Sequence, residues 1–306
     1  MLVSFVIPVF DEADSLRELA QGIVEHARPH ECEIVFVDDG SRDRSLEVIK
    51  ELAREHAEVR YIAFRRNFGK SAALDAGFQA ARGDIVFTLD ADLQDDPAEI
   101  PAFLRKLDEG FDLVSGWKKE RHDPLGKTLP SKVFNWLARR ITGVTLHDMN
   151  CGFKAYRREV VKDLVLYGDL HRFVPALAGW RGFRVGELVV RHRARRFGHS
   201  KFGMERFLRG LFDLLTVYFL TSYTARPMHL FGKVGLATGT LGFLGLAYLY
   251  IVKFITGAGI GARPLLFICI FLMGIGIQIF LFGLITELIV SQKKRTTADY
   301  SIREQS

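Results

Sequence analysis

Two long stretches without a charged residue, both late in the chain, constrain its fold most. They cover residues 234–252 and 264–286, or 19 and 23 positions of the 306. As helices they would extend about 29 and 35 Å, close to the hydrocarbon thickness of a bilayer. A pair of buried core helices is the alternative, but the rest of the chain is too small to enclose two such helices. We therefore predict a membrane hairpin attached to a separate soluble domain.

Basic residues indicate how this hairpin is oriented. They gather at its outer ends: Arg209, Arg226 and Lys233 before the first stretch, and Lys293, Lys294 and Arg295 after the second. The connecting loop carries only Lys253 and Arg263. The positive-inside rule then predicts that both ends of the hairpin are cytoplasmic. Residues 1–7 read as a short strand and not as a secretory signal, so we expect a cytoplasmic soluble domain on the plasma (inner) membrane.

The net charge indicates which partners the protein could bind, and the cysteine spacing indicates the state of its thiols. The formal net charge of +6 suits contact with anionic lipid. It would suit nucleic acid too, but the apolar stretches make membrane lipid the better partner, and we expect no nucleic acid. Cys32, Cys151 and Cys269 lie far apart without metal-ligand spacing, so we expect reduced, structural thiols. The 9 histidines also lack ligand spacing and are predicted to be structural.

The first 120 residues alternate strand-like and helix-like segments. Strands are predicted at residues 3–9, 33–38, 59–64, 85–89 and 112–115, and helices at 15–27, 43–56, 71–81 and 97–109. This alternation predicts an α/β domain with a parallel sheet and right-handed crossovers. Shorter strands near 152–156 and across 184–192 would complete it.

Two later segments have amphipathic helical patterns. They are residues 132–142 and 204–223, each with an apolar stripe opposed by charged or polar side chains. Such helices either lie in the membrane interface or pack onto the soluble core. The second leads directly towards the first apolar stretch, and for it we favour the interface.

Polar residues follow each of the first four predicted strands. The segments are FDE (10–12), DDGS (38–41), RRNFGK (65–70) and DADLQ (90–94). Each alone could be ordinary turn or helix-entry chemistry. In a parallel sheet, however, all four lie along the carboxyl edge, where open α/β sheets bind ligands.

The last of these segments has the donors for a metal site. If the chain stays extended, Asp90, Asp92 and Gln94 share one side, and hard oxygen donors suit Mg²⁺ or Mn²⁺. The alternative is an acidic turn that caps a helix starting at Pro97. The chain contains neither GxGxxG nor GxxxxGK[ST], which argues against a dinucleotide dehydrogenase and a phosphate-loop NTPase. Without a glycine cradle, a diphosphate here would need a metal.

The motifs VIPVFDE, VDDGSRDRS, NFGK and DADLQDDP resemble, in order and spacing, the family 2 glycosyltransferases. HDMNCGFKAYRRE and RRFGHSKFG are similar to the branch acting on polyprenyl or dolichyl phosphates, and two C-terminal spans fit its bacterial members. The resemblance covers residues 1–205. It implies a GT-A (Rossmann-like) catalytic domain at 1–203. The amphipathic, apolar and charge patterns described above add an interface region at 204–226, transmembrane helices within 227–292 (at 228–252 and 264–290), and a cytoplasmic tail at 293–306.

The resemblance also implies roles for individual residues. The nucleotide sugar would be held by Pro8, Phe10, Glu12, Asp38, Asp39, Lys70, Asp90 and Ala91. Asp90, Asp92 and Gln94 would hold Mg²⁺ or Mn²⁺ and, through it, the diphosphate. The catalytic set would be Asp90, Asp92, Asp148, Arg195 and Lys201, and the acceptor-phosphate contacts Lys118, Arg121, Arg195, Ser200 and Lys201. The family often has Gly-x-Arg where this chain has Gly116-Trp117-Lys118, so the choice between Lys118 and Arg121 stays open.

The expected reaction is an inverting transfer from a nucleoside-diphosphate sugar to a polyprenyl phosphate of undecaprenyl or dolichyl type. UDP is favoured over GDP by the resemblance to bacterial members, and the sugar is unspecified. The acceptor phosphate is mostly a dianion at neutral pH, so we expect Asp148 to position groups without having to act as a base.

Two other functions compete with this one. A processive polysaccharide synthase would have the same catalytic domain, but its Gln-x-x-Arg-Trp motif is missing here. A membrane scaffold with a dead site is the other, against which the intact Asp90, Asp92 and Gln94 argue. The glycines of the first span, Gly235, Gly239, Gly242 and Gly245, permit close helix packing, and a homo-oligomer is therefore left open.

Overall fold

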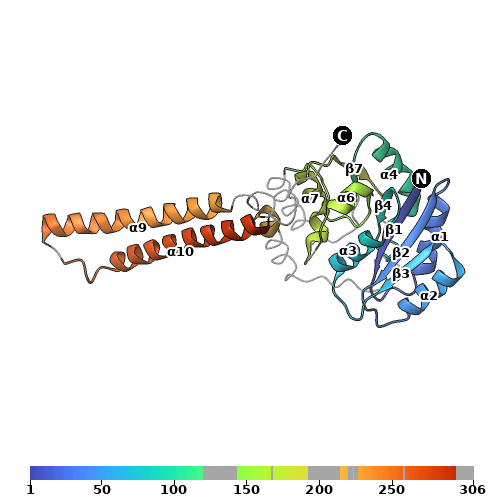
Figure 1. Ribbon diagram of the computed structural model, residues 1–306, viewed down its shortest axis with the longest axis horizontal. Helices are drawn as coiled ribbons and strands as arrows, with labels where there is room; N and C mark the ends of the chain where they lie inside the picture. The colour runs from blue at the N-terminus through green and yellow to red at the C-terminus, as the bar shows by residue number, and fades with distance from the viewer. Residues whose placement is uncertain are drawn as a thin grey trace. The chain divides into compact units, whose positions relative to one another are not determined.

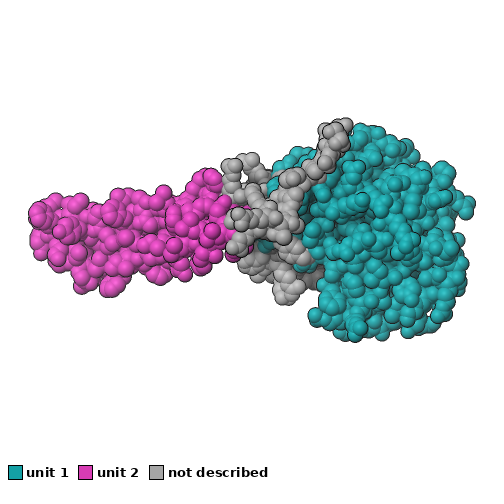
Figure 2. Space-filling view, in the orientation of Figure 1, with its two compact units in different colours: residues 1–217 teal, residues 218–306 magenta. Residues whose placement is uncertain are grey.

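The computed structural model describes residues 1–119, 143–166, 168–191, 214–219, 223, 227–257 and 259–293. The chain divides into two compact units, Met1–Val217 and Tyr218–Ser306 (Figure 2). The predicted contacts Arg121, Arg195, Ser200 and Lys201 lie outside the described residues, as do the stretch 132–142 and the tail 294–306. Of the stretch 204–226, residues 214–219 are described as helical.

The first unit is built on a seven-stranded sheet with the order β3-β2-β1-β4-β6-β5-β7 (Figure 1). The strands are β1 (Leu2–Val9), β2 (Glu31–Asp38), β3 (Val59–Ala63), β4 (Ile85–Thr88), β5 (Leu113–Trp117), β6 (Lys154–Arg157) and β7 (Val185–Val189). β1 to β4 are parallel to one another, as predicted. β6 lies between β4 and β5 and is antiparallel to both, which makes the sheet mixed.

The helices connect these strands close to where the periodicity predicts them. They are α1 (Leu16–His26), α2 (Ser45–Glu55), α3 (Lys70–Ala80), α4 (Ile100–Asp108), α6 (Arg158–Asp163) and α7 (Val174–Trp180), with 3-10 turns η1 (Pro97–Glu99) and η2 (Leu170–Phe173). The helix predicted at 97–109 is thus divided into η1 and α4.

The helices cover both faces of the sheet because alternate strand residues point to opposite sides. Phe5 of β1 packs with residues of α1, α2 and α4, whereas the neighbouring Val6 packs with residues of α3, α6 and α7. Phe87 of β4 stacks on Phe5, with ring centroids 5.1 Å apart, and meets the edge of Phe103 of α4 at 5.9 Å. Burial on both faces is typical of parallel strands. Because β1 to β4 are parallel, their carboxyl ends lie along one edge of the sheet.

The second unit contains two long helices, α9 (Met228–Thr256) and α10 (Pro264–Lys293). Both are long and apolar enough to cross a membrane. Only 17% of the most apolar part of α9 and 11% of that of α10 are buried. Core helices of a soluble protein would be mostly buried, so this exposure favours lipid-facing spans.

Glycines bring α9 and α10 into backbone contact. A Cβ added to Gly276 would lie 2.5 Å from the Gly239 nitrogen and 2.7 Å from the Gly235 oxygen. A Cβ on Gly242 would lie 2.7 Å from the Cys269 oxygen. The glycine stripe that the sequence offers for close packing therefore serves the hairpin itself.

Candidate active site

The loops after β1 and β2 are joined by hydrogen bonds at the carboxyl edge of the sheet. The Asp11 amide donates to Ser41 Oγ at 3.1 Å, and the Arg42 amide donates back to Asp11 Oδ1 at 2.7 Å. The Glu12 amide donates to Ser45 Oγ at 2.9 Å. Asp11 adopts a left-handed φ of 55°, a conformation that Asp tolerates better than most residues. Polar segments predicted to meet at this edge are thus joined by hydrogen bonds from backbone amides to side-chain oxygens.

Asp39 connects the end of β2 to the start of α3. Its Oδ1 accepts from the Phe68 amide at 2.7 Å, and its Oδ2 accepts from the Gly69 amide at 2.9 Å. Burial raises the pKa of Asp39 despite these two bonds. The adjacent Asp38 is also buried, and its Oδ1 accepts from the Ser41 amide at 3.3 Å. Both predicted nucleotide contacts therefore have a structural task, and their role towards a nucleotide remains a prediction.

The remaining predicted nucleotide contacts lie on the same edge. Pro8, Phe10 and Glu12, at the end of β1 and just beyond it, are half-buried, and Ala91 is buried in the loop after β4. Their role towards a nucleotide stays a prediction.

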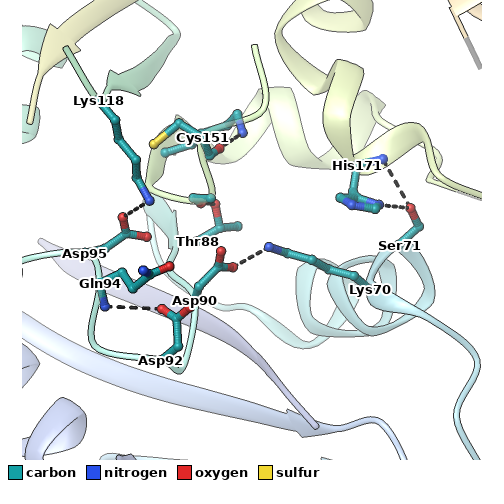
Figure 3. Close-up of polar contacts among 12 residues, drawn as sticks. Lys70, Ser71, Thr88, Asp90, Asp92, Gln94, Asp95, Lys118, Cys151 and His171 are labelled. Atoms are coloured by element: carbon teal, nitrogen blue, oxygen red, sulfur yellow. Dashed lines mark hydrogen bonds and ion pairs between the residues drawn. The ribbon is translucent and has the colours of Figure 1, made fainter. Parts of the chain in front are cut away.

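The acidic loop after β4 corrects one sequence-based premise. The strand ends at Thr88, and residues 91–93 form a turn in which Leu93 has a left-handed φ of 58°. The chain is therefore not extended, and alternate spacing does not align the side chains. The turn brings them together instead: Asp92 Oδ1 accepts from the Gln94 amide at 3.2 Å, and Asp90, Asp92, Gln94 and Asp95 gather around it (Figure 3).

Asp90 meets a lysine from another element. Lys70, the first residue of α3, forms an ion pair with Asp90 Oδ1 through its Nζ (Figure 3). Burial opposes ionisation of Asp90, but attraction to Lys70 and then Lys118 holds its pKa below the usual range. Two residues predicted to serve the same substrate are thus in direct contact.

Gly152 lies directly against the Asp90 carboxylate. A Cβ added to Gly152 would lie 2.6 Å from Asp90 Oδ2 and 2.8 Å from Oδ1. The peptide of Gly152 is held by Thr88 Oγ1, which donates to its carbonyl oxygen at 2.8 Å. Gly152 belongs to the HDMNCGFKAYRRE motif, but its contact with Asp90 cannot be read from the sequence.

A buried ion pair between Asp95 and Lys118 was missed by the sequence analysis. Asp95 Oδ1 lies 2.8 Å from Lys118 Nζ, and the two side chains are 0% and 13% exposed. Burial and the nearby Asp90 and Asp92 raise the pKa of Asp95 even though Lys118 lowers it. Asp95 in turn holds the pKa of Lys118 above its usual value against the effect of burial. The two aspartates that follow Gln94, Asp95 and Asp96, were the sequence feature that could have pointed to this pair.

Lys118→Met is expected to lower the free energy of unfolding by about 3 kcal/mol, because it leaves the buried Asp95 carboxylate without its cation. Unfolding of the full chain in detergent, followed by tryptophan fluorescence, measures this. Lys119→Met is the matched control, since the neighbouring Lys119 is exposed. If Lys118→Met unfolds like the wild type but binds the acceptor weakly, Lys118 serves substrate phosphate instead.

Glu187 of β7 holds the loop that carries Asp148. Its Oε1 accepts from the amides of His147 at 2.8 Å and Asp148 at 3.0 Å, and its Oε2 lies 2.8 Å from His147 Nδ1. The His147 ring stacks on Trp117 at 4.1 Å. Asp148 itself is buried, and its Oδ1 accepts from the Asn150 amide at 3.2 Å. This network holds Asp148 in place, and its role as a positioning group stays a prediction.

Two further titratable groups lie beside the acidic loop. Lys154 of β6 is buried and donates through Nζ to the Cys151 carbonyl oxygen; burial, and then Lys70, lower its pKa. His171 Nδ1 lies 2.9 Å from Ser71 Oγ, and burial lowers its pKa to about 2. His171 is therefore neutral at pH 7 and anchors η2 to α3, as expected of a structural histidine.

The donors of the acidic loop fit a hard cation. Asp90 and Asp92 offer carboxylates and Gln94 an amide oxygen, and the Oδ2 of the adjacent Asp95 has no hydrogen-bond partner among the described residues. Among the residues that the structure describes, no group of three or more His, Cys, Asp or Glu side chains is arranged to hold a metal ion. Mg²⁺ sites commonly use one or two carboxylates and complete the shell with substrate phosphates. The donors of the acidic loop are therefore of a type that suits Mg²⁺ or Mn²⁺, and the metal site stays a prediction.

The basic segment predicted to bind phosphate is described only at its start. Arg191 is largely exposed, with Nε 4.0 Å from Glu99 Oε1. Arg195, Ser200 and Lys201 lie beyond the described residues, as does Arg121. Their roles remain as predicted from the sequence.

Residues 4–165 match the family described as Glycosyl transferase family 2. The chain is 41% identical to "Dodecaprenyl-phosphate galacturonate synthase" of Rhizobium johnstonii, over 99% of this chain and 92% of that protein. It is 38% identical to "Undecaprenyl-phosphate 4-deoxy-4-formamido-L-arabinose transferase" of Pseudomonas aeruginosa, over 94% and 84%.

A solved structure has a similar fold. Glucosyl-3-phosphoglycerate synthase from Mycobacterium tuberculosis, crystallised with Mn²⁺, UDP and glucosyl-3-phosphoglycerate, gives a TM-score of 0.56 at 19% identity, over 72% of this chain and 79% of that one. The likeness confirms the GT-A type of α/β fold predicted from the sequence.

Proposed function

Because the chain belongs to glycosyl transferase family 2, we propose that it transfers a sugar from a nucleoside-diphosphate sugar to a polyprenyl phosphate at a membrane. The names of its relatives support this choice of acceptor, since each is a transferase or synthase for a dodecaprenyl or undecaprenyl phosphate. The observation that carries the proposal is the contact of the acidic loop with Lys70 and Lys118, in a chain that also has two helices apolar enough to cross a membrane.

On the donor side, Asp90, Asp92 and Gln94 would hold Mg²⁺ or Mn²⁺. When bound, such an ion neutralises charge that develops on the leaving diphosphate. Lys70, on the rim of the same loop, would donate hydrogen bonds to phosphate oxygens. We favour UDP over GDP as carrier. The half-buried Pro8, Phe10 and Glu12 would line the nucleotide's position, with Asp38 and Asp39 fixing the loops around it.

On the acceptor side, the lipid phosphate is the nucleophile. Its second pKa near 6 makes it mostly dianionic at pH 7, so it needs little help from a base. Asp148, held by Glu187, would orient groups near the attacking oxygen. Arg195 and Lys201, with Ser200 and either Lys118 or Arg121, would receive the phosphate and offset its repulsion from the diphosphate. The catalytic unit and both termini would lie on the cytoplasmic side of the inner membrane.

A transfer assay tests this proposal. Purified full-length protein is incubated with radiolabelled UDP- or GDP-sugars and undecaprenyl phosphate, with Mn²⁺, with Mg²⁺ or with EDTA. We expect one UDP-sugar to label the lipid with one sugar per chain, and EDTA to abolish the product. Label in a growing polymer would identify a processive synthase. Donor turnover and lipid labelling both missing across a full sugar panel would contradict an active transferase.

A further inference from the structure

Lys70 forms an ion pair with Asp90, the carboxylate that the proposed function assigns to a divalent cation. Lys70 Nζ contacts Asp90 Oδ1, and each side chain is 33% exposed. The pair is therefore accessible to ions and ligands from solvent. It also lies on the loop whose donor set suits a divalent cation, so the lysine and the cation address the same carboxylate.

Of the two partners, Asp90 is fixed and Lys70 can move. The Asp90 carboxylate rests on Gly152, where an added Cβ would come within 2.6 to 2.8 Å of its carboxylate atoms. Gly152 is itself held through the bond from Thr88 Oγ1. Lys70 starts α3, and its ammonium sits at the end of a flexible four-carbon stem. A cation that arrives at Asp90 would displace the lysine rather than the carboxylate.

A divalent ion held by the Asp90 carboxylate would compete with Lys70 for it. With both bound to one oxygen, three positive charges would lie within about 4 Å, and their repulsion is strong in a partly buried site. Lys118 and Lys154 already act on Asp90 from further away, which adds to the cost. A diphosphate removes the conflict, because its oxygens can accept the released ammonium of Lys70.

We propose that Lys70 occupies the divalent ion's place on Asp90 until a nucleoside diphosphate arrives, and that this exchange makes the ion and the diphosphate bind cooperatively. The inference rests on the metal site of the proposed function. It adds that metal alone binds weakly, and that Lys70 moves from carboxylate to phosphate as both ligands enter. By linkage, each ligand then tightens the binding of the other by the same factor.

Mn²⁺ binding measures this without any transfer reaction. Free Mn²⁺ is followed by electron paramagnetic resonance in titrations of the full-length protein, with and without UDP. In the wild type, UDP should tighten Mn²⁺ binding strongly. In Lys70→Met, Mn²⁺ alone should bind at least about tenfold tighter than in the wild type, since a competing charge is gone. The tightening by UDP should shrink correspondingly. Lys106→Met is the control, because Lys106 pairs with Glu109 on the surface.

The outcomes separate this inference from the proposed function. If Mn²⁺ binds with UDP but Lys70→Met changes neither the affinity for Mn²⁺ alone nor the UDP effect, the exchange at Asp90 is wrong and the metal site stands. If no variant binds Mn²⁺ with or without UDP, while lipid labelling proceeds in EDTA, the metal site and the exchange both fail. A tenfold gain in Lys106→Met as well would show a general charge effect and also overturn the exchange.

Discussion

Asp92→Asn is expected to lower the rate of sugar transfer by about three orders of magnitude. Asp92 is buried in the turn after β4, and its Oδ1 accepts from the Gln94 amide at 3.2 Å. Asparagine has the same shape and keeps a carbonyl oxygen for that bond, so the turn should persist. What it lacks is the negative charge that would hold a divalent ion and, through it, the leaving diphosphate. Initial rates of lipid labelling at saturating donor and Mn²⁺ measure the effect.

Asp96→Asn is the matched control for this substitution. Asp96 is buried in the same loop, and its Oδ1 accepts from the Ala98 amide at 3.1 Å at the start of η1. Asparagine caps helical turns about as well as aspartate, so this variant should transfer sugar at nearly the wild-type rate. An Asp92→Asn rate within about tenfold of the wild type would argue against a metal ligand at this position.

Gly152→Ala is expected to lower the transfer rate by about 100-fold, as a shift of roughly 1 Å in a reacting group commonly does. The new methyl would lie 2.6 Å from Asp90 Oδ2 and 2.7 Å from its Cγ, so the carboxylate has to move. Gly152 has no left-handed φ, and alanine therefore fits the backbone. The damage should fall on the position of Asp90 and less on the fold.

The measurement pairs activity with stability. Transfer rates and thermal unfolding of Gly152→Ala are compared with those of Gly274→Ala, a glycine of α10 around which an added Cβ meets nothing within 4 Å. Overpacking in a buried site costs about 1–3 kcal/mol, so Gly152→Ala should remain folded at assay temperature. A folded variant with unchanged transfer would mean that the position of Asp90 does not control the reaction.

The sequence predicted the parallel part of the sheet because its signals are local. Apolar runs of strand length alternate with helical patterns from β1 to α4, and each structured segment lies within a few residues of its predicted range. The antiparallel β6 between β4 and β5 could not be predicted in the same way. Its place depends on pairing with strands distant in sequence, and a run of four residues carries no signal for direction.

The sequence predicted which edge of the sheet carries the candidate site, but not which side chains contact one another there. The polar segments do meet at one edge. The chain is not extended at Asp90 and Asp92, however, because Leu93 turns the backbone. Asp95, Gly152 and Glu187 were not recognised. Each acts through a partner that folding supplies: Lys118 for Asp95, Asp90 for Gly152, and the amide of Asp148 for Glu187.

By itself, the sequence determined that this chain has an α/β domain with an acidic loop at its sheet edge and two apolar helices that follow. Those features depend on periodicity and composition, which act over short stretches of chain. Only the tertiary structure decided that Asp90 pairs with Lys70, that Asp95 is buried against Lys118, and that Gly152 lies against Asp90. These contacts join residues that lie far apart in the sequence, so they depend on how the chain packs and not on any local pattern.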